Sequence, residues 1–184
     1  MPHFIRTGAA LLFLFLASCA KDNRYRMIVS AADQRMAVFD KDKPLAFFRI
    51  STSKFALSDA PGSNGTPLGR MEVAEKIGGG QPLGMKFSGR VATGEIVRVN
   101  APRRDPIVTR ILWLRGLESQ NRHTHSRFIY IHGTPEERFL GHPASYGCIR
   151  MSSRDVAWLY STVGVGAKVQ VVREPLSYHL SPNH

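Results

Sequence analysis

A histidine and a cysteine lie sixteen positions apart in a segment that suits acyl transfer. His132 ends the apolar run 128–131, and Cys148 follows Gly147 directly before a second short apolar run. A free thiol has a pKa of roughly 8.5 and is mostly protonated at neutral pH, so a neighbouring imidazole can activate it. If the intervening loop folds back, His132 and Cys148 form a base and a nucleophile. We expect an imidazolium to hold the thiolate in such a pair.

The glycine beside the cysteine adds a second element of this chemistry. Gly147 allows the backbone to turn tightly, so that its N–H and that of Cys148 face a developing oxyanion. One cysteine and one histidine also occur together by chance, and His132 could equally be a histidine that closes a strand end. The pair alone therefore leaves catalysis and a structural role open.

The surrounding motifs are more specific than the pair. The chain reads HGT at 132–134, SYGCIRM at 145–151 and TPLG at 66–69. This pattern resembles the L,D-transpeptidases of the YkuD/ErfK type, over roughly residues 25–173. That family commonly has Ser-His-Gly-Cys at the nucleophile, and Tyr146 stands here in place of the variable histidine.

The resemblance implies a mostly β catalytic domain and a reaction on peptidoglycan. Cys148 would attack the bond between the diamino acid and the terminal D-Ala of a tetrapeptide stem, and a thioester acyl-enzyme would form. His132 would accept the thiol proton and protonate the leaving amine. An amine then resolves the thioester: a second stem (a 3–3 cross-link), a free D-amino acid, or a lysine of a wall-linked lipoprotein. The resemblance implies neither a metal nor an organic cofactor.

Two other functions remain open. Water could replace the amine on the same scaffold, which gives an L,D-carboxypeptidase or an amidase that releases wall-linked protein. The chain could also be a wall-binding lipoprotein without catalysis, although a nucleophile and a base in motif context disfavour this. The choice between amine and water depends on access to the site, which the sequence does not reveal.

Other residues are candidates for substrate binding. Arg150 follows Cys148 by two positions, which places both on one side of an extended segment. Its guanidinium could bind a stem carboxylate in bidentate fashion, or be an ordinary surface arginine. The remaining candidates, from the motifs and the resemblance, are Ser145, Tyr146, Gly133, Thr66 and Gly69. Roles stay open for His123, His125, His142, Arg103, Arg104 and Arg110, and we expect surface histidines rather than a metal site because acidic ligands are missing at suitable spacing.

Charge and the N-terminus indicate where the protein works. The net charge is +11, from 25 basic against 14 acidic residues, which favours an anionic partner. Residues 1–18 combine Arg6 with a short apolar stretch and end in LAS before Cys19, which resembles a bacterial lipoprotein signal. We therefore expect lipidation of Cys19, anchoring to a membrane facing the periplasm (the outer membrane weakly favoured) and no nucleic-acid partner. Only two cysteines are present, which excludes a disulfide-rich scaffold and a four-cysteine zinc site.

The elements that must position this chemistry are mostly strands. We expect a short tether at 19–24, one catalytic domain at 25–173 and a tail at 174–184. Alternating or apolar runs bounded by turn residues predict strands at 25–30, 35–40, 45–51, 69–74, 95–100, 107–114, 127–132 and 168–173. An apolar stripe at Val156, Leu159, Tyr160 and Val163 predicts one helix, opened by a capping box at 152–155. The fold class is a β-sandwich or open barrel with one helix after the catalytic cysteine.

Overall fold

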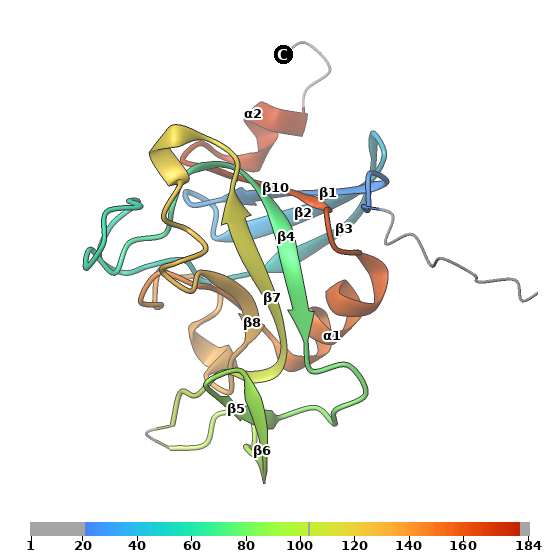
Figure 1. Cartoon of the computed structure of the whole chain (residues 1–184), viewed down its shortest axis with the longest axis vertical. Coiled ribbons are helices and arrows are strands. Elements are labelled where there is room, and N and C mark those ends of the chain that lie inside the picture. The colour runs from blue at the N-terminus through green and yellow to red at the C-terminus, as the bar shows by residue number, and fades with distance from the viewer. Residues whose placement is uncertain (1–20, 103, 181–184) are drawn as a thin grey trace, which may run out of the picture.

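The computed structural model describes residues 21–102 and 104–180, and Figure 1 shows their arrangement. Strands dominate this part of the chain, with two α-helices and two 3-10 helices beside them. The strands are β1 Tyr25–Ser30, β2 Arg35–Asp40, β3 Lys43–Arg49, β4 Gly69–Ile77, β5 Met85–Ser88, β6 Val91–Ile96, β7 Val108–Gly116, β8 Tyr130–Gly133, β9 Ile149–Met151 and β10 Lys168–Val172. The helices are α1 Ser153–Thr162 and α2 Leu176–Leu180, with 3-10 helices η1 Ser119–Asn121 and η2 Glu137–Phe139.

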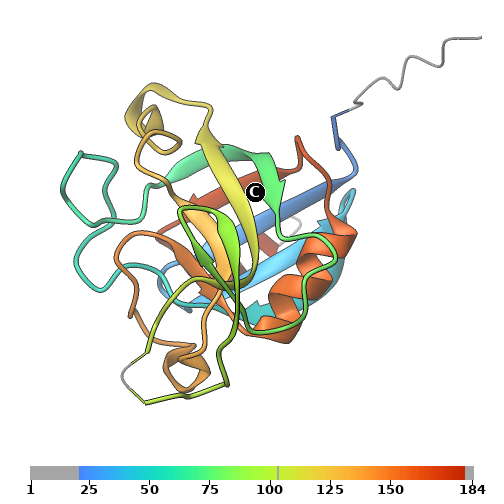
Figure 2. The ribbon, with the colours of Figure 1, turned by 60° about the horizontal axis from the view of Figure 1, so that its bottom comes forward.

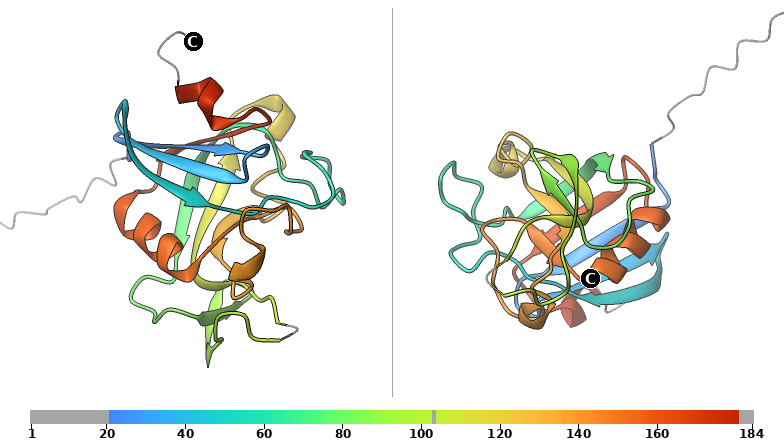
Figure 3. Two further views of the ribbon diagram at one scale, coloured as in Figure 1. Left: turned by 180° about the vertical axis from the view of Figure 1, so that it is seen from behind. Right: turned by 90° about the horizontal axis from the view of Figure 1, so that it is seen from below.

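All of these strands belong to one curved sheet. Its path runs β3-β2-β1-β10-β4-β7-β5-β6, and β8 pairs with β7 and with β9. In Figure 1 the group β1–β3 runs across the molecule, while the antiparallel strands β4 and β7 lie close to vertical. Helix α1 lies in the angle between these two groups, as the reverse view in Figure 3 also shows. The expected mostly β domain with one principal helix is confirmed, with a single curved sheet as its framework.

Two apolar clusters lie on opposite sides of β7 and β8. The main core contains Leu112, Ile131 and Ile149 together with apolar residues of α1 such as Val156 and Leu159. The smaller cluster gathers the hairpin β5–β6 against β7 and β8 and consists of Met85, Phe87, Ile111, Trp113 and Tyr130. Figure 2 brings this hairpin forward, in front of β7 and β8. Side chains of β8 therefore alternate between a large core and a small one that underlies the hairpin.

The N-terminus of α1 follows its sequence signal. Ser152 is the N-cap residue, and its side chain accepts a hydrogen bond from the Asp155 backbone N–H at 3.1 Å. Such a cap satisfies one of the N–H groups that the first helical turn leaves without a partner. Gly164 does not cap the other end, because the helix ends at Thr162 and the Gly164 N–H donates to Asp22 instead.

The strand predictions failed mainly around the hairpin. The strand expected at 95–100 is wrong, because β6 ends at Ile96 and the chain then leaves the sheet. The glycine-rich stretch 78–89 carries no strand pattern in the sequence, yet it contains β5. Positive φ at Gly84 and Gly89 lets the chain turn into and out of that strand. Short strands between glycines carry too little periodicity to be recognised.

Some expectations fall outside the described residues. The signal at 1–18, Cys19 and Arg103 lie there. Within residues 21–102 and 104–180, neither helix is both long and apolar enough to cross a lipid bilayer.

Candidate active site

The parallel pairing of β8 and β9 brings the histidine segment to the cysteine segment. In this register Ile131 lies opposite Ile149, and His132 lies opposite Arg150. Ile131 and Ile149 both face the main core. Because successive side chains point to opposite faces of a sheet, His132 and Arg150 face the other side, and so does Cys148, two positions before Arg150. Residues sixteen positions apart in the chain thus share one face of two neighbouring strands.

The thiol of Cys148 is held by the backbone of the segment that leads into β8. Its Sγ accepts a hydrogen bond from the Tyr130 N–H at 3.4 Å, and it contacts the Phe128 carbonyl oxygen at 3.5 Å. The side chain is partly buried against the smaller apolar cluster. Phe128 has a positive φ of 58°, a conformation that is rare for a bulky residue. The backbone therefore departs from a regular strand at the point where it meets the sulfur.

The turn before Cys148 is fixed by two hydroxyl groups. Ser145 Oγ donates to the Cys148 carbonyl and accepts from the Gly147 N–H at 3.2 Å. Thr66 Oγ1 donates to the Gly147 carbonyl at 2.9 Å. Gly147 has a φ of 123°, which L side chains rarely adopt. The expectation that the Gly147 N–H faces an oxyanion is not met in this structure, because that N–H is bonded to Ser145.

The His132 ring is oriented by the strand that carries it. The side chain is only 5% exposed, and its Nδ1 lies 2.9 Å from the Gly133 carbonyl oxygen. A carbonyl oxygen can only accept, so Nδ1 carries the proton and Nε2 is left as the basic nitrogen. Burial lowers the pKa of His132 to about 4, the Gly133 carbonyl opposes this shift, and the Arg150 charge reinforces it. The imidazole is therefore neutral at pH 7.

The thiol is also neutral in the resting site. Burial raises the pKa of Cys148 to about 11 and outweighs the Tyr130 N–H and the charges of Arg150 and Arg127, all of which lower it. This corrects the expected imidazolium–thiolate pair. Desolvation of both groups disfavours charge on either one, so proton transfer from sulfur to imidazole belongs to the attack on the substrate.

Replacing Thr66 by valine tests how the nucleophile turn is held. Thr66 is fully buried, and its Oγ1 accepts from the Ser53 N–H at 2.9 Å while donating to the Gly147 carbonyl. Valine keeps the shape and leaves both backbone groups unpaired, so we expect a loss of about 1–3 kcal/mol in unfolding free energy. Urea denaturation of Thr66→Val measures this loss. Thr66→Ser keeps the hydroxyl, and an equal loss in both variants would contradict the assigned bonds.

Comparison with known proteins agrees with this geometry. The family model of the YkuD type, described as the L,D-transpeptidase catalytic domain, matches residues 24–171. The chain belongs to this family. The matched residues include both strands that carry the site and the turn at Thr66.

Named relatives and solved structures support the same assignment. A probable L,D-transpeptidase ErfK/SrfK of Escherichia coli is 37% identical over 57 residues, and a probable L,D-transpeptidase YbiS of the same species is 35% identical over 57 residues. These segments cover 31% of this chain but only 18% and 19% of the relatives, so the match spans less than a fifth of their length.

The fold is shared with solved members of the family. L,D-transpeptidase 3 from Mycobacterium tuberculosis, in complex with a faropenem-derived adduct, has a TM-score of 0.53 at 18% identity, covering 82% of this chain and 60% of that one. A Xylanimonas cellulosilytica L,D-transpeptidase has a TM-score of 0.52 at 16% identity, covering 83% of this chain and 62% of that one. At such identities the likeness concerns the fold.

Arg150 does not occupy the position expected of a substrate-binding arginine. Its side chain is buried, with 6% of the residue exposed, and its guanidinium pairs with Asp105 and lies 3.9 Å from Glu136. Asp105 also accepts from Thr134 Oγ1 at 2.8 Å. A buried cation with two carboxylate partners gains little from a third. Arg150 therefore ties the loop after β6 to the edge of the site rather than facing a ligand.

The other motif residues differ in how near they lie to the thiol. Gly133 serves through its carbonyl, and a side chain there would clash with the Val108 carbonyl oxygen at 2.6 Å. Tyr146 is 59% exposed at the mouth of the site, with its ring 5.1 Å from Phe55. Gly69 lies in β4, where an added Cβ would meet the carboxylate of Glu118, so its role is structural.

One ion pair next to the site was not predicted from the sequence. Arg127 is largely buried and pairs with Asp59 at 3.2 Å. The same guanidinium donates to the carbonyls of Ser58 and Gly65, which fixes the loop leading to Thr66. Arg127 directly precedes Phe128, whose carbonyl oxygen contacts the Cys148 sulfur. The only sequence signal was an arginine beside the histidine strand, which is too common to be distinctive.

Three of the histidines and arginines left open, His125, Arg104 and Arg110, have ordinary partners. The His125 ring stacks on Trp113 at 4.1 Å between centroids and lies 3.5 Å from Glu75. Arg104 pairs with Glu95, and Arg110 lies over the Tyr160 ring at 5.5 Å. In the described part of the chain, His, Cys, Asp and Glu side chains do not gather in groups of three that could hold a metal ion.

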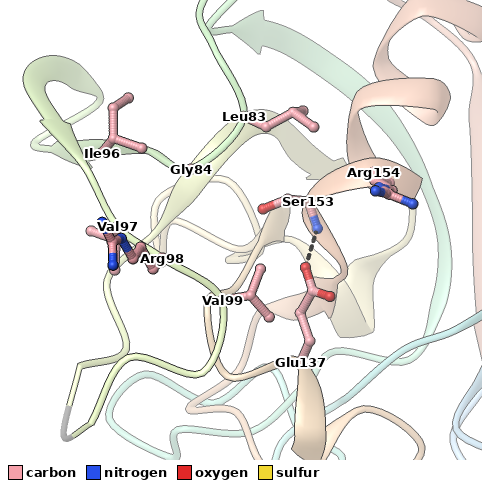
Figure 4. A pocket seen from close by; sticks show the side chains of 9 residues that line it. All are labelled: Leu83, Gly84, Ile96, Val97, Arg98, Val99, Glu137, Ser153 and Arg154. Carbon is pink, nitrogen blue, oxygen red and sulfur yellow. Dashed lines mark hydrogen bonds between the residues drawn. The ribbon is translucent and has the colours of Figure 1, made fainter.

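A separate cleft lies between the loop after β6 and the start of α1 (Figure 4). Its volume is about 470 Å³, and Ile96, Val97, Arg98 and Arg154 are among its lining residues. Glu137 accepts from the Ser153 N–H at 2.9 Å, the contact drawn as a dashed line in Figure 4. Neither Cys148 nor His132 lines this cleft. The Glu137 carboxylate in this cleft is already bonded to the N-terminus of α1.

Proposed function

We propose that this protein is a peptidoglycan L,D-transpeptidase that works through a Cys148 thioester. The observation that carries the proposal is the pairing of β8 with β9, which places the clamped Cys148 thiol on the same face as a His132 with a fixed tautomer. The family assignment and the names of the Escherichia coli relatives support the substrate class.

The chemistry follows from two neutral partners. As Cys148 Sγ attacks the carbonyl carbon of the diamino acid, its proton moves to His132 Nε2. The carbonyl oxygen becomes an oxyanion, and we assign the backbone N–H of Cys148 as its donor, because the Gly147 N–H is bonded to Ser145. Collapse breaks the C–N bond, the imidazolium gives its proton to the leaving D-alanine amine, and a thioester remains. An acceptor amine then attacks the thioester and loses a proton to His132. The C–S bond breaks as the new amide forms, and the imidazolium returns the proton to the leaving sulfur of Cys148.

The Nδ1 hydrogen bond fixes the role of the base. Because Gly133 holds the Nδ1 proton, only Nε2 can exchange protons with sulfur and substrate. Burial favours the neutral imidazole and the neutral thiol before and after each proton transfer. The imidazolium therefore exists only while a neighbouring oxyanion or thiolate balances its charge. A buried, low-pKa imidazole serves this shuttle because it gives the proton up readily.

Three amine acceptors and water compete in the second step. A second stem gives a 3–3 cross-link, a free D-amino acid gives exchange, a lipoprotein lysine gives protein attachment, and water gives a shortened stem. We favour the amines, because the family is named for transfer, and keep hydrolysis as the alternative.

Product analysis tests this function. The purified protein is incubated with disaccharide tetrapeptides, with and without D-methionine, and the products are separated and weighed by mass spectrometry. We expect cross-linked dimers or D-methionine-substituted stems together with free D-alanine. Only shortened stems would identify a carboxypeptidase, and unchanged stems would overturn the proposal.

We also propose that a lipid on Cys19 anchors the protein in the periplasm. The signal-like sequence of residues 1–18 and the net charge of +11 support export to an acidic wall polymer. Cys19→Ala is expected to move the protein from the membrane fraction to an unprocessed or soluble form. Immunoblots of cell fractions check this, and unchanged partitioning would contradict lipidation.

A further inference from the structure

Arg90 projects a cation from the hairpin into the aromatic cluster beside the nucleophile. It lies in the tight turn between β5 and β6 with a φ of 70°. Its guanidinium carbon is 4.7 Å from the centroid of the Trp113 ring and 5.1 Å from that of Phe128. It also donates to the Tyr130 hydroxyl at 3.4 Å. Three aromatic side chains thus fix the position of this cation.

Two of these aromatic residues also hold the sulfur. The Tyr130 N–H donates to Cys148 Sγ, and the Phe128 carbonyl contacts the same atom. Cys148 packs against the cluster that contains Trp113 and Tyr130. The hairpin therefore brings the guanidinium onto the aromatic cluster against which Cys148 packs. In Figure 2 the hairpin lies in front of β8, the strand that carries Tyr130.

Arg90 differs from the other site arginines in its partners. Arg150 pairs with Asp105 and Glu136, and Arg127 pairs with Asp59. Within the described chain, no carboxylate forms an ion pair with Arg90, and Glu75 lies 3.5 Å from the His125 ring. Ring faces hold a guanidinium without using its N–H donors. Most of the five donors of Arg90 thus remain for a ligand.

A carboxylate is the ligand that fits a planar guanidinium held in this way. In the proposed donor, the terminal carboxylate carbon follows the scissile carbonyl carbon by three bonds, a span of about 4 Å at most. When the scissile carbon is against Sγ, the carboxylate lies close to the apolar cluster that packs against Cys148, and Arg90 lies over the Trp113 ring of that cluster. Paired there, the carboxylate has a partly buried cation as its counter-charge.

We propose that Arg90 binds the terminal D-alanine carboxylate of the donor stem. This inference rests on the proposed function and deepens it. A longer or amidated stem presents a neutral amide at that position and loses the charged pair. The carboxylate departs with D-alanine, which leaves Arg90 open for the acceptor step.

Two donors that differ only in the terminal group test the proposal. One is a tetrapeptide with a free carboxylate, and the other carries a carboxamide in its place. Acylation of the full chain is followed by intact-protein mass spectrometry, and kcat/KM for acylation is compared. We expect the wild type to prefer the acid by about 10- to 100-fold, which corresponds to one hydrogen-bonded charged pair. Arg90→Gln should lose most of the rate on the acid and little on the amide, so that the preference falls close to unity.

Matched variants separate charge recognition from folding. Arg90→Lys keeps the positive charge but lacks the planar guanidinium that binds a carboxylate with two hydrogen bonds, so it should retain part of the preference for the acid. Arg26→Gln removes an arginine that lies over the Phe39 ring at 3.9 Å, outside the site, and should change neither rate. Equal losses on both donors in Arg90→Gln, or a wild type that does not discriminate, would overturn the role of Arg90. If neither donor acylates the wild type while iodoacetamide still modifies Cys148, the proposed function itself fails.

Discussion

Cys148→Ala is expected to abolish the release of D-alanine from a tetrapeptide donor. The sulfur is the atom that takes the acyl group. The hydroxyl groups of Ser145 and Thr66 cannot replace it, because they donate to the backbone carbonyls of Cys148 and Gly147. Removing a covalent nucleophile from a site of this kind lowers turnover by about a million-fold, to background. A coupled D-amino acid oxidase assay measures the release.

The second cysteine provides the matched control. Cys19 lies outside the described residues and is the only other cysteine of the chain. Cys19→Ala, assayed as purified protein, should release D-alanine at the wild-type rate. Residual release from Cys148→Ala at more than a thousandth of that rate would mean that a group other than this thiol carries the acyl chain.

His132→Ala is expected to slow acylation by about 10²- to 10⁴-fold, the usual contribution of a positioned general base. The pKa of His132 is lowered to about 4, so its basic form persists above that pH. Acylation by the wild type should therefore survive at pH 5–6 and fall only as the pH approaches 4. A free imidazole, with a pKa of roughly 6.5, would already lose activity below pH 6.5. Single-turnover acylation against pH checks this profile.

Alkylation reports on the resting thiol in the same variants. Because burial raises the pKa of Cys148 to about 11, iodoacetamide should react slowly at pH 7 and faster up to and beyond pH 9. Tyr146→Phe serves as the control, because it removes only the hydroxyl that accepts from Lys54 at 3.1 Å. It should leave the pH profiles of acylation and of alkylation unchanged. Fast alkylation of the wild type at pH 6, lost in His132→Ala, would show a resting ion pair and contradict the neutral site.

The sequence predicted the nucleophile and base because both stand in short local motifs. His132 and Gly133 end a strand, and Ser145 and Gly147 form the turn that their types favour. The single helix could also be predicted, since its cap and apolar stripe are local features. Pairing of β8 with β9 is not local, so the alignment of His132 opposite Arg150 became visible only in the fold.

The roles of the arginines could not be predicted for the same reason. Arg150 was expected to face substrate from its distance of two residues to Cys148, but Asp105 and Glu136 reach it from other segments. Arg90 lies in the turn between β5 and β6, more than fifty positions from the nucleophile, and no sequence motif marks it. The protonation states likewise depend on burial, which residue types alone do not determine.

The mass of the protein during reaction with a tetrapeptide donor tests the central claim most directly. Intact-protein mass spectrometry of an acid-quenched mixture, followed by peptide mapping, locates any adduct. The proposed mechanism predicts a gain equal to the donor minus one alanine, on the peptide that contains Cys148, and its disappearance when an acceptor amine is added. No gain, a gain of the whole donor, or an adduct on another residue would contradict it.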